Sequence, residues 1–128
     1  MIVYKTEAEI ARLRESSRIT GTILAELGDM IEPGLRTADL DAHAERRTLE
    51  FGAKPAFKGY RGFPGSICVS INEEVIHGSP SSRKLKEGDL VSIDFGVLYE
   101  GYYGDAARTY PVGRVAPDAL RLVRIAED

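Results

Sequence analysis

The sequence predicts a single α+β domain that covers residues 1–128. Two observations lead to this class. Apolar residues recur at three- and four-residue steps up to about residue 51 and again after Pro117, as in helices, whereas residues 66–112 contain alternating, β-rich segments bounded by glycines. Helices that are separated in sequence from a run of strands are typical of α+β domains.

The first helix is expected to begin after Thr6. Thr6-Glu7-Ala8-Glu9 is a Ser/Thr-x-x-Glu pattern, in which the Thr hydroxyl and the Glu carboxylate each accept a backbone N–H that the first turn leaves without a partner. The apolar stripe of this helix consists of Ile10, Leu13, Ile23, Leu24, Leu27 and Ile31. Because Pro33-Gly34 ends the pattern, we expect a long amphipathic helix that covers another surface.

A second helix is expected from about Thr37 to Phe51, with Leu40 and Ala44 on one side. Gly52 follows it, at the position where helices commonly end in the left-handed conformation. The next segment, 54–64, is rich in glycine, proline and aromatic residues. Since linkers rarely contain aromatic residues, we expect a structured loop of the kind that lines a pocket.

Three strands are expected at 66–71, 89–97 and 105–112, paired antiparallel. A third helix should begin near Pro117, because proline is tolerated in the first turn of a helix. The sequence ends at Asp128 within this helical pattern, with no glycine, proline or cap. We therefore expect a third helix truncated from a longer structural plan.

The composition argues against several classes of function. The net charge is -3 and no block of Lys and Arg is present, so the chain lacks the basic patch that nucleic-acid binding requires. Lys5, Glu7 and Glu9 interrupt the start of the chain where a secretory signal would be apolar, and no later stretch is long enough to cross a bilayer. With one cysteine and hence no internal disulfide, the expected location is the cytoplasm.

Two acids on neighbouring strands are candidate metal ligands. Asp94 and Asp105 are symmetric about a turn centred between Tyr99 and Glu100, which would place them directly opposite each other on one face, with Cβ atoms about 4.5 to 5.5 Å apart. Such carboxylates repel each other and need a proton, a basic side chain or a metal cation. The alternative is a solvated hairpin with two unrelated acids, the class to which we assign Asp89.

Histidine and cysteine offer further candidates. His77 directly precedes Gly78-Ser79-Pro80, so its imidazole could face a cleft or could instead hold the turn by a hydrogen bond. His43 lies inside a charged helix and is expected at its boundary or surface. Cys68 belongs to an alternating strand, where a buried thiol is the commoner role, and the sequence shows no base that would activate it as a nucleophile.

Four sequence blocks occur in an order and spacing that resemble bacterial type I methionine aminopeptidases. They are Lys54-Pro-Ala-Phe-Lys-Gly-Tyr-Arg-Gly-Phe-Pro, Ser66-Ile-Cys-Val-Ser-Ile-Asn-Glu-Glu-Val-Ile-His-Gly, Glu87-Gly-Asp-Leu-Val-Ser-Ile-Asp and Gly104-Asp-Ala-Ala-Arg-Thr. The resemblance extends from about Tyr4 to the last residues. It implies the first half of the pita-bread fold, with an antiparallel sheet backed by two helices plus a truncated third helix.

The resemblance also implies roles for individual residues. Asp94 would be a two-oxygen ligand of one metal ion, and Asp105 would bridge two ions. His77 would be catalytic, contacting the substrate and stabilising the reacting peptide group. The pocket for the amino-terminal methionine of a peptide or nascent chain would be lined by Phe57, Tyr60, Phe63 and Cys68. An apolar, aromatic pocket suits a thioether side chain.

The implied reaction is removal of the initiator Met by water that two divalent ions (Co, Mn, Fe or Zn) activate. The remaining ligands of the family, one His and two Glu, belong to the second half and have no counterpart here. A second copy of the chain or a separate carboxy-terminal half could complete the site. Two other hypotheses remain: a non-catalytic half-module that binds a peptide or protein, and a structural fragment.

Overall fold

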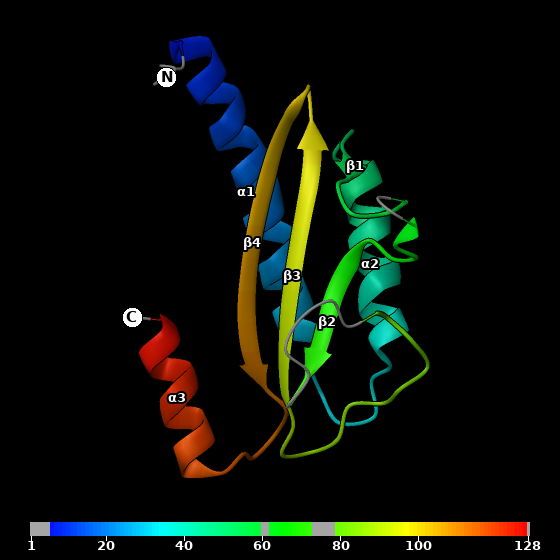
Figure 1. Ribbon diagram of the computed structural model, residues 1–128, viewed down its shortest axis with the longest axis vertical. Coiled ribbons are helices and arrows are strands. Elements are labelled where there is room, and N and C mark those ends of the chain that lie inside the picture. Colours follow the sequence, from blue (N-terminus) through cyan, green and yellow to red (C-terminus); the bar gives the residue numbers. More distant parts are fainter. Residues whose placement is uncertain (1–5, 60–61, 73–78, 128) are drawn as a thin grey trace.

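Figure 1 shows the computed structural model, which describes residues 6–59, 62–72 and 79–127. In chain order the elements are α1 (Glu7–Met30), α2 (Thr37–Glu50), β1 (Lys54–Pro55), β2 (Ile67–Ile71), β3 (Leu90–Tyr99), β4 (Tyr102–Pro111) and α3 (Pro117–Glu127). Each predicted helix and strand is present, and the strands pair antiparallel as expected. The α+β class is therefore confirmed.

Helix α1 begins with the capping box that the sequence predicts. The Glu9 amide donates to Thr6 Oγ1 at 3.1 Å, and the Thr6 amide donates to Glu9 Oε1 at 3.1 Å. The buried stripe of the helix starts later than predicted, since Ile10 is 38% exposed. Figure 1 gives the reason: the first turns of α1 extend away from the strands. Burial therefore begins with Ser16 and Ile19, where the helix reaches the sheet.

Strand β3 is the centre of the sheet. Strand β4 pairs with it along the whole of one edge. The other edge is shared: β1 pairs with Val97 and Leu98, and β2 pairs with residues 91–95. The sequence analysis missed β1, because two residues that include a proline show no alternating pattern. Because β1 and β2 pair with different parts of the same edge of β3, the chain between them leaves the sheet as a loop.

The β3–β4 hairpin turns at Glu100 and Gly101, which have φ angles of 50° and 85°. Positive φ at both central residues is typical of the tight type I′ turn that matches the twist of antiparallel strands. The predicted centre between Tyr99 and Glu100 is therefore wrong by one residue, and Tyr99 pairs instead with Tyr102. This shift decides how the candidate acids lie.

The two faces of the sheet differ. One face packs against α1 and α2, which lie behind it in Figure 1. Its core residues alternate along the strands and are at most 2% exposed: Ile67, Val69, Ile71, Val91, Ile93, Phe95 and Val97. Neither α1 nor α2 lies on the opposite face. That face carries the strand residues that alternate with the core residues. We call this the open face.

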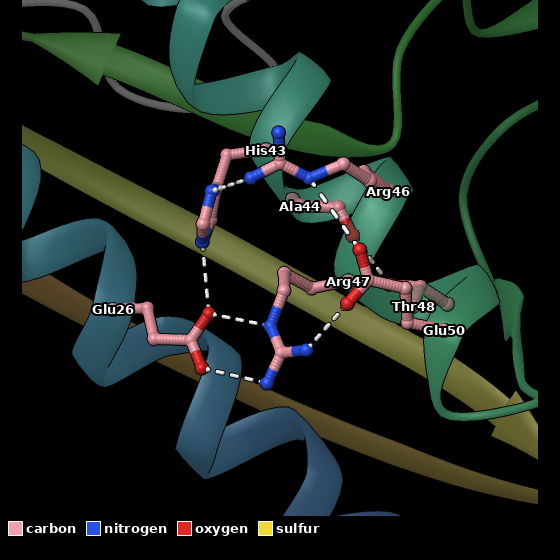
Figure 2. Close-up of polar contacts among 7 residues, drawn as sticks. All are labelled: Glu26, His43, Ala44, Arg46, Arg47, Thr48 and Glu50. Carbon is pink, nitrogen blue, oxygen red and sulfur yellow. Dashed lines mark hydrogen bonds and ion pairs between the residues drawn. The ribbon is translucent and has the colours of Figure 1, made fainter.

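A polar network joins α1 to α2 beside the core (Figure 2). Glu26 Oε1 lies 2.8 Å from His43 Nε2 and accepts from Arg47 Nε at 2.9 Å, while Arg47 Nη1 donates to Glu50 at 2.7 Å. The hydrogen bond from Arg47, supported by that from His43, lowers the pKa of the Glu26 carboxyl. His43, within α2, lies at the boundary between buried and exposed positions, as predicted. Its contact with Glu26 helps to hold the two helices together.

Helix α3 packs against the sheet mainly at β4. Val123 is buried, whereas Leu122 and Ile125 are 65% and 60% exposed. One side of α3 therefore anchors it and another side presents apolar residues to solvent. Within the residues that the structure describes, no helix is long and apolar enough to span a membrane.

Candidate metal and substrate site

Asp94 and Asp105 lie on the same face of the hairpin, as predicted, but not opposite each other. Because the turn is shifted by one residue, the register moves by two: Asp94 pairs with Ala107 and Asp105 with Gly96. Side chains two residues apart on a strand share a face, so the acids are diagonal neighbours on the open face. Diagonal neighbours on adjacent strands lie about 7 to 8 Å apart, and the two side chains can bring their carboxylate oxygens closer together than that.

The open face is hollowed beside these acids. The hollow has a volume of about 860 Å³ and forms where the chain leaves the sheet between β1 and β2. It is lined by Ala56, Phe57, Gly62, Phe63, Pro64, Cys68, Asp94, Gly96, Tyr103, Gly104 and Asp105. Both candidate metal ligands and three of the candidate pocket residues, Phe57, Phe63 and Cys68, therefore meet in one place. We call it the open-face hollow.

The remaining candidates, His77 and Tyr60, lie outside the described residues. Their roles stay predictions from the resemblance. Asp89 is not the solvated acid that we expected: it is 9% exposed, and its carboxylate accepts from Asn72 Nδ2 at 3.0 Å and from the Lys86 amide at 2.9 Å. It closes the loop that leads into β3.

Cys68 is the partner of Asp94 across the β2–β3 ladder, so its side chain shares the open face with the acids. Burial, and next the negative charges of Asp94 and Asp105, raise the pKa of the Cys68 thiol. A raised pKa keeps the thiol protonated and weakly nucleophilic at neutral pH. Cys68 is thus suited to be an apolar wall of the hollow rather than a nucleophile.

Asp41 on α2 holds the start of β2, a role that the sequence analysis missed. Its Oδ1 accepts from the Ser66 amide at 2.6 Å and from the Ile67 amide at 3.2 Å. These bonds fix the point at which the loop rejoins the sheet and so place Cys68 beside the acids. Local sequence patterns could not predict these two hydrogen bonds, because the bonded residues are 25 and 26 positions apart.

Asp105 is placed by a close approach of β4 to α1. A Cβ on Gly104 would lie 2.5 Å from the Ser16 carbonyl oxygen, so only glycine fits at this point. The buried Ser16 hydroxyl donates to the Tyr102 carbonyl at 3.0 Å, which ties the hairpin end to the helix. The residue before Asp105 therefore rests directly on α1, and the acid itself points to the other face.

The donor set fits one part of a divalent metal site. Carboxylate oxygens suit Mn, Fe, Co or Zn, and Asp94 and Asp105, on one face, could both offer oxygen ligands to divalent ions. Among the described residues, however, no group of three or more His, Cys, Asp or Glu side chains is arranged to hold an ion. Asp94 and Asp105 would supply part of a coordination shell, and further ligands must come from elsewhere.

Comparison with known proteins agrees with this geometry. Residues 11–128 match the metallopeptidase family M24. The chain is 50% identical over 128 residues to methionine aminopeptidase 1 of Bacillus subtilis, covering 100% of this chain and 52% of the relative. It is similar to the solved structure of methionine aminopeptidase from Rickettsia prowazekii, with a TM-score of 0.96, 38% identity and coverage of 100% and 52%. The corresponding values for the Thermotoga maritima enzyme are 0.94, 41%, 99% and 51%.

The chain spans about half the length of the relatives that it matches. Its three helices and antiparallel sheet are one α+β half of the pita-bread fold and correspond to the amino-terminal half of methionine aminopeptidase structures. M24 is a metal-dependent peptidase family. The matched residues and the fold show that this chain belongs to metallopeptidase family M24 and is a homologue of the first half of methionine aminopeptidases.

Proposed function

We propose that this chain provides the amino-terminal half of a methionine aminopeptidase site, which removes the initiator Met from nascent polypeptides in the cytoplasm. One observation carries the proposal: Asp94 and Asp105 share the open-face hollow with Phe57, Phe63 and Cys68. Oxygen ligands for a divalent cation thus adjoin an apolar pocket. That combination is what hydrolysis next to an amino-terminal methionine requires.

The residues would have three roles. Asp94 and Asp105 would hold divalent ions, two per complete site, and the bound ions would supply activation of water and polarisation of the peptide carbonyl. Phe57, Phe63 and Cys68 would surround the thioether side chain of the substrate. His77 would contact the reacting peptide group, as the resemblance implies. Tyr60 would add a further aromatic wall to the pocket.

For residues 1–128 alone, activity should require a complementing half that covers the open face. The described residues hold no group of three metal-binding side chains, and the relatives that this chain matches are about twice as long. A separate carboxy-terminal half is the simplest partner. A second copy of this chain is the other, and it would bring two more aspartates to the interface.

The test is complementation. The purified chain is mixed with the unmatched second half of Bacillus subtilis methionine aminopeptidase 1, and hydrolysis of Met-Ala-Ser is followed with Mn or Co. We expect turnover on mixing and its loss in Asp105→Ala. Turnover by the chain alone that grows faster than linearly with concentration would indicate self-assembly instead. If the folded chain gives no turnover in either arrangement, the proposed enzymatic function is wrong.

A non-catalytic peptide-binding half-module is the second candidate, and the incomplete donor set among the described residues favours it. Titration with Met-Ala-Ser after treatment with a chelator separates the two. Binding that persists unchanged without metal, together with absent hydrolysis, would support the module. Binding that depends on added Mn or Zn would support the metallopeptidase half.

A further inference from the structure

Gly96 forms part of the floor of the open-face hollow. It is buried in β3, and its ladder partner on β4 is Asp105. On the other edge of β3, the Ala56 amide donates to the Gly96 carbonyl at 3.0 Å, at the point where the chain leaves the sheet. Gly96 therefore stands between the aromatic loop and one of the two candidate metal ligands.

The ring of Phe57 packs closely against this glycine. A Cβ on Gly96 would lie 3.4 Å from Phe57 Cε1, 3.4 Å from Ala56 Cβ and 3.0 Å from the Gly104 carbonyl oxygen. Gly96 does not have a positive φ, so the backbone conformation itself would accept another residue. What favours glycine here is space, because a Cβ would crowd the Gly104 carbonyl oxygen, touch the Phe57 ring and rise into the hollow.

We propose that Gly96 is a specificity-determining position for the first residue of the substrate. Without a side chain, it keeps the floor of the hollow at backbone level and lets the Phe57 ring pack against β3. The depth that remains suits a long, unbranched apolar side chain such as methionine. This inference rests on the proposed function, since it assigns the hollow to a peptide amino terminus.

The experiment compares two tripeptides on the full chain. Binding of Met-Ala-Ser and Ala-Ala-Ser is measured by NMR titration in the presence of Zn, which does not broaden the signals. The parent should prefer the methionine peptide by about tenfold or more, the range that one to a few methylenes contribute in an apolar pocket. Gly96→Ala should bring the ratio of the two dissociation constants close to one.

Gly21→Ala is the matched control. It is the same chemical change on the exposed side of α1, where an added Cβ would meet nothing within 4 Å. This variant should keep the parent's preference between the tripeptides. A loss of preference in both variants would mean that the effect of Gly96→Ala is not specific to the hollow, and it would overturn the inference.

A second variant tests whether the effect passes through Phe57. In the parent, the ring current of Phe57 should displace the Gly96 Hα resonance, and Phe57→Leu should abolish that displacement without any ligand. If Gly96 acts by positioning the ring, Gly96→Ala should change the peptide ratio much less in the Phe57→Leu background than in the parent, as coupled neighbours do.

The outcomes separate this inference from the proposed function. A folded Gly96→Ala chain that keeps the parent's ratio within twofold overturns the role of Gly96, although complementation with the second half could still give hydrolysis. The role is equally wrong if the parent does not distinguish the two peptides. Conversely, a preference that depends on Gly96 with no hydrolysis after complementation supports the pocket and contradicts the enzyme.

Discussion

The two faces of one sheet are built on opposite principles. On the helix-covered face, Val91, Ile93 and Phe95 are fully buried in the core between the sheet and the helices. On the open face, the intervening positions include a charged carboxylate, Asp94, and an aromatic residue, Tyr103, that is 64% exposed. The same strands thus contribute core residues on one side and the candidate metal ligands on the other. Substitutions on the covered face should therefore lower stability, whereas substitutions on the open face should affect the proposed site.

The largest expected effect is on the covered face. Phe95→Ala should lower the free energy of unfolding by about 3 to 5 kcal/mol, because a fully buried ring leaves a cavity. Tyr103→Ala, on the open face, should cost less than about 1 kcal/mol. Urea unfolding followed by circular dichroism measures both. Equal losses would show that the two faces do not differ as described.

The close contact between β4 and α1 should come next. Gly104→Ala should cost about 3 kcal/mol, since its Cβ would overlap the Ser16 carbonyl oxygen, 2.5 Å away. Gly21→Ala, in the same helix but facing open space, should instead stabilise the chain by about 1 kcal/mol, the difference in helix propensity. The same unfolding experiment decides between them. A stabilising effect of Gly104→Ala would contradict the observed packing.

Stabilisation by a divalent metal ion should depend on the acids of the open-face hollow and not on an exposed acid elsewhere. At a free Mn concentration 100 times its dissociation constant, a site that forms only in the folded chain adds about 2.7 kcal/mol of stability. Thermal unfolding with and without Mn should show this gain in the parent and not in Asp94→Asn. Glu100→Gln, on the exposed hairpin turn, is the control and should keep the gain. A melting temperature that no divalent ion raises would contradict the metal site.

The smallest effect concerns the network between α1 and α2. Glu26→Gln should cost about 1 kcal/mol at pH 7, a modest value because these side chains are partly exposed. Since the pKa of Glu26 is lowered in the folded state, its contribution is complete above the ordinary carboxyl value of 4.5 and is lost as the pH falls through the lowered pKa. Unfolding at pH 7 and pH 3 should show the difference shrinking in acid.

Exposed Glu32, just after α1, is the matched control for that experiment. Glu32→Gln should change the stability by no more than about 0.5 kcal/mol at either pH. If Glu26→Gln also had no effect at pH 7, the network in Figure 2 would contribute nothing measurable to the packing of the helices.

Much of the fold could be predicted from short stretches of sequence. The capping box of Thr6 and Glu9, the left-handed Gly52 and the β-rich segment that forms β2 depend on neighbours within a few residues, and the structure confirms all three. Cys68 could be placed on a strand for the same reason. The bonds of Asp41 to β2 could not be predicted, because they join residues 25 and 26 positions apart.

The site shows the same division. The residue types and the order of the four blocks were sufficient to nominate Asp94, Asp105 and the aromatic loop. Their arrangement was not, because register depends on the φ angles of the Glu100–Gly101 turn, and a shift of one residue there moves every cross-strand pair by two.

By itself, therefore, the sequence determined the three helices, the strands other than β1, the face that would be buried and the family. Tertiary structure decided that the two acids are diagonal rather than opposed, and that the loop leaves the sheet at Gly96. It also decided that only one face is covered by α1 and α2. The physical reason is range: caps and periodicity act between neighbours in the chain, whereas register, hollows and layers arise from contacts between distant segments, which no local pattern records.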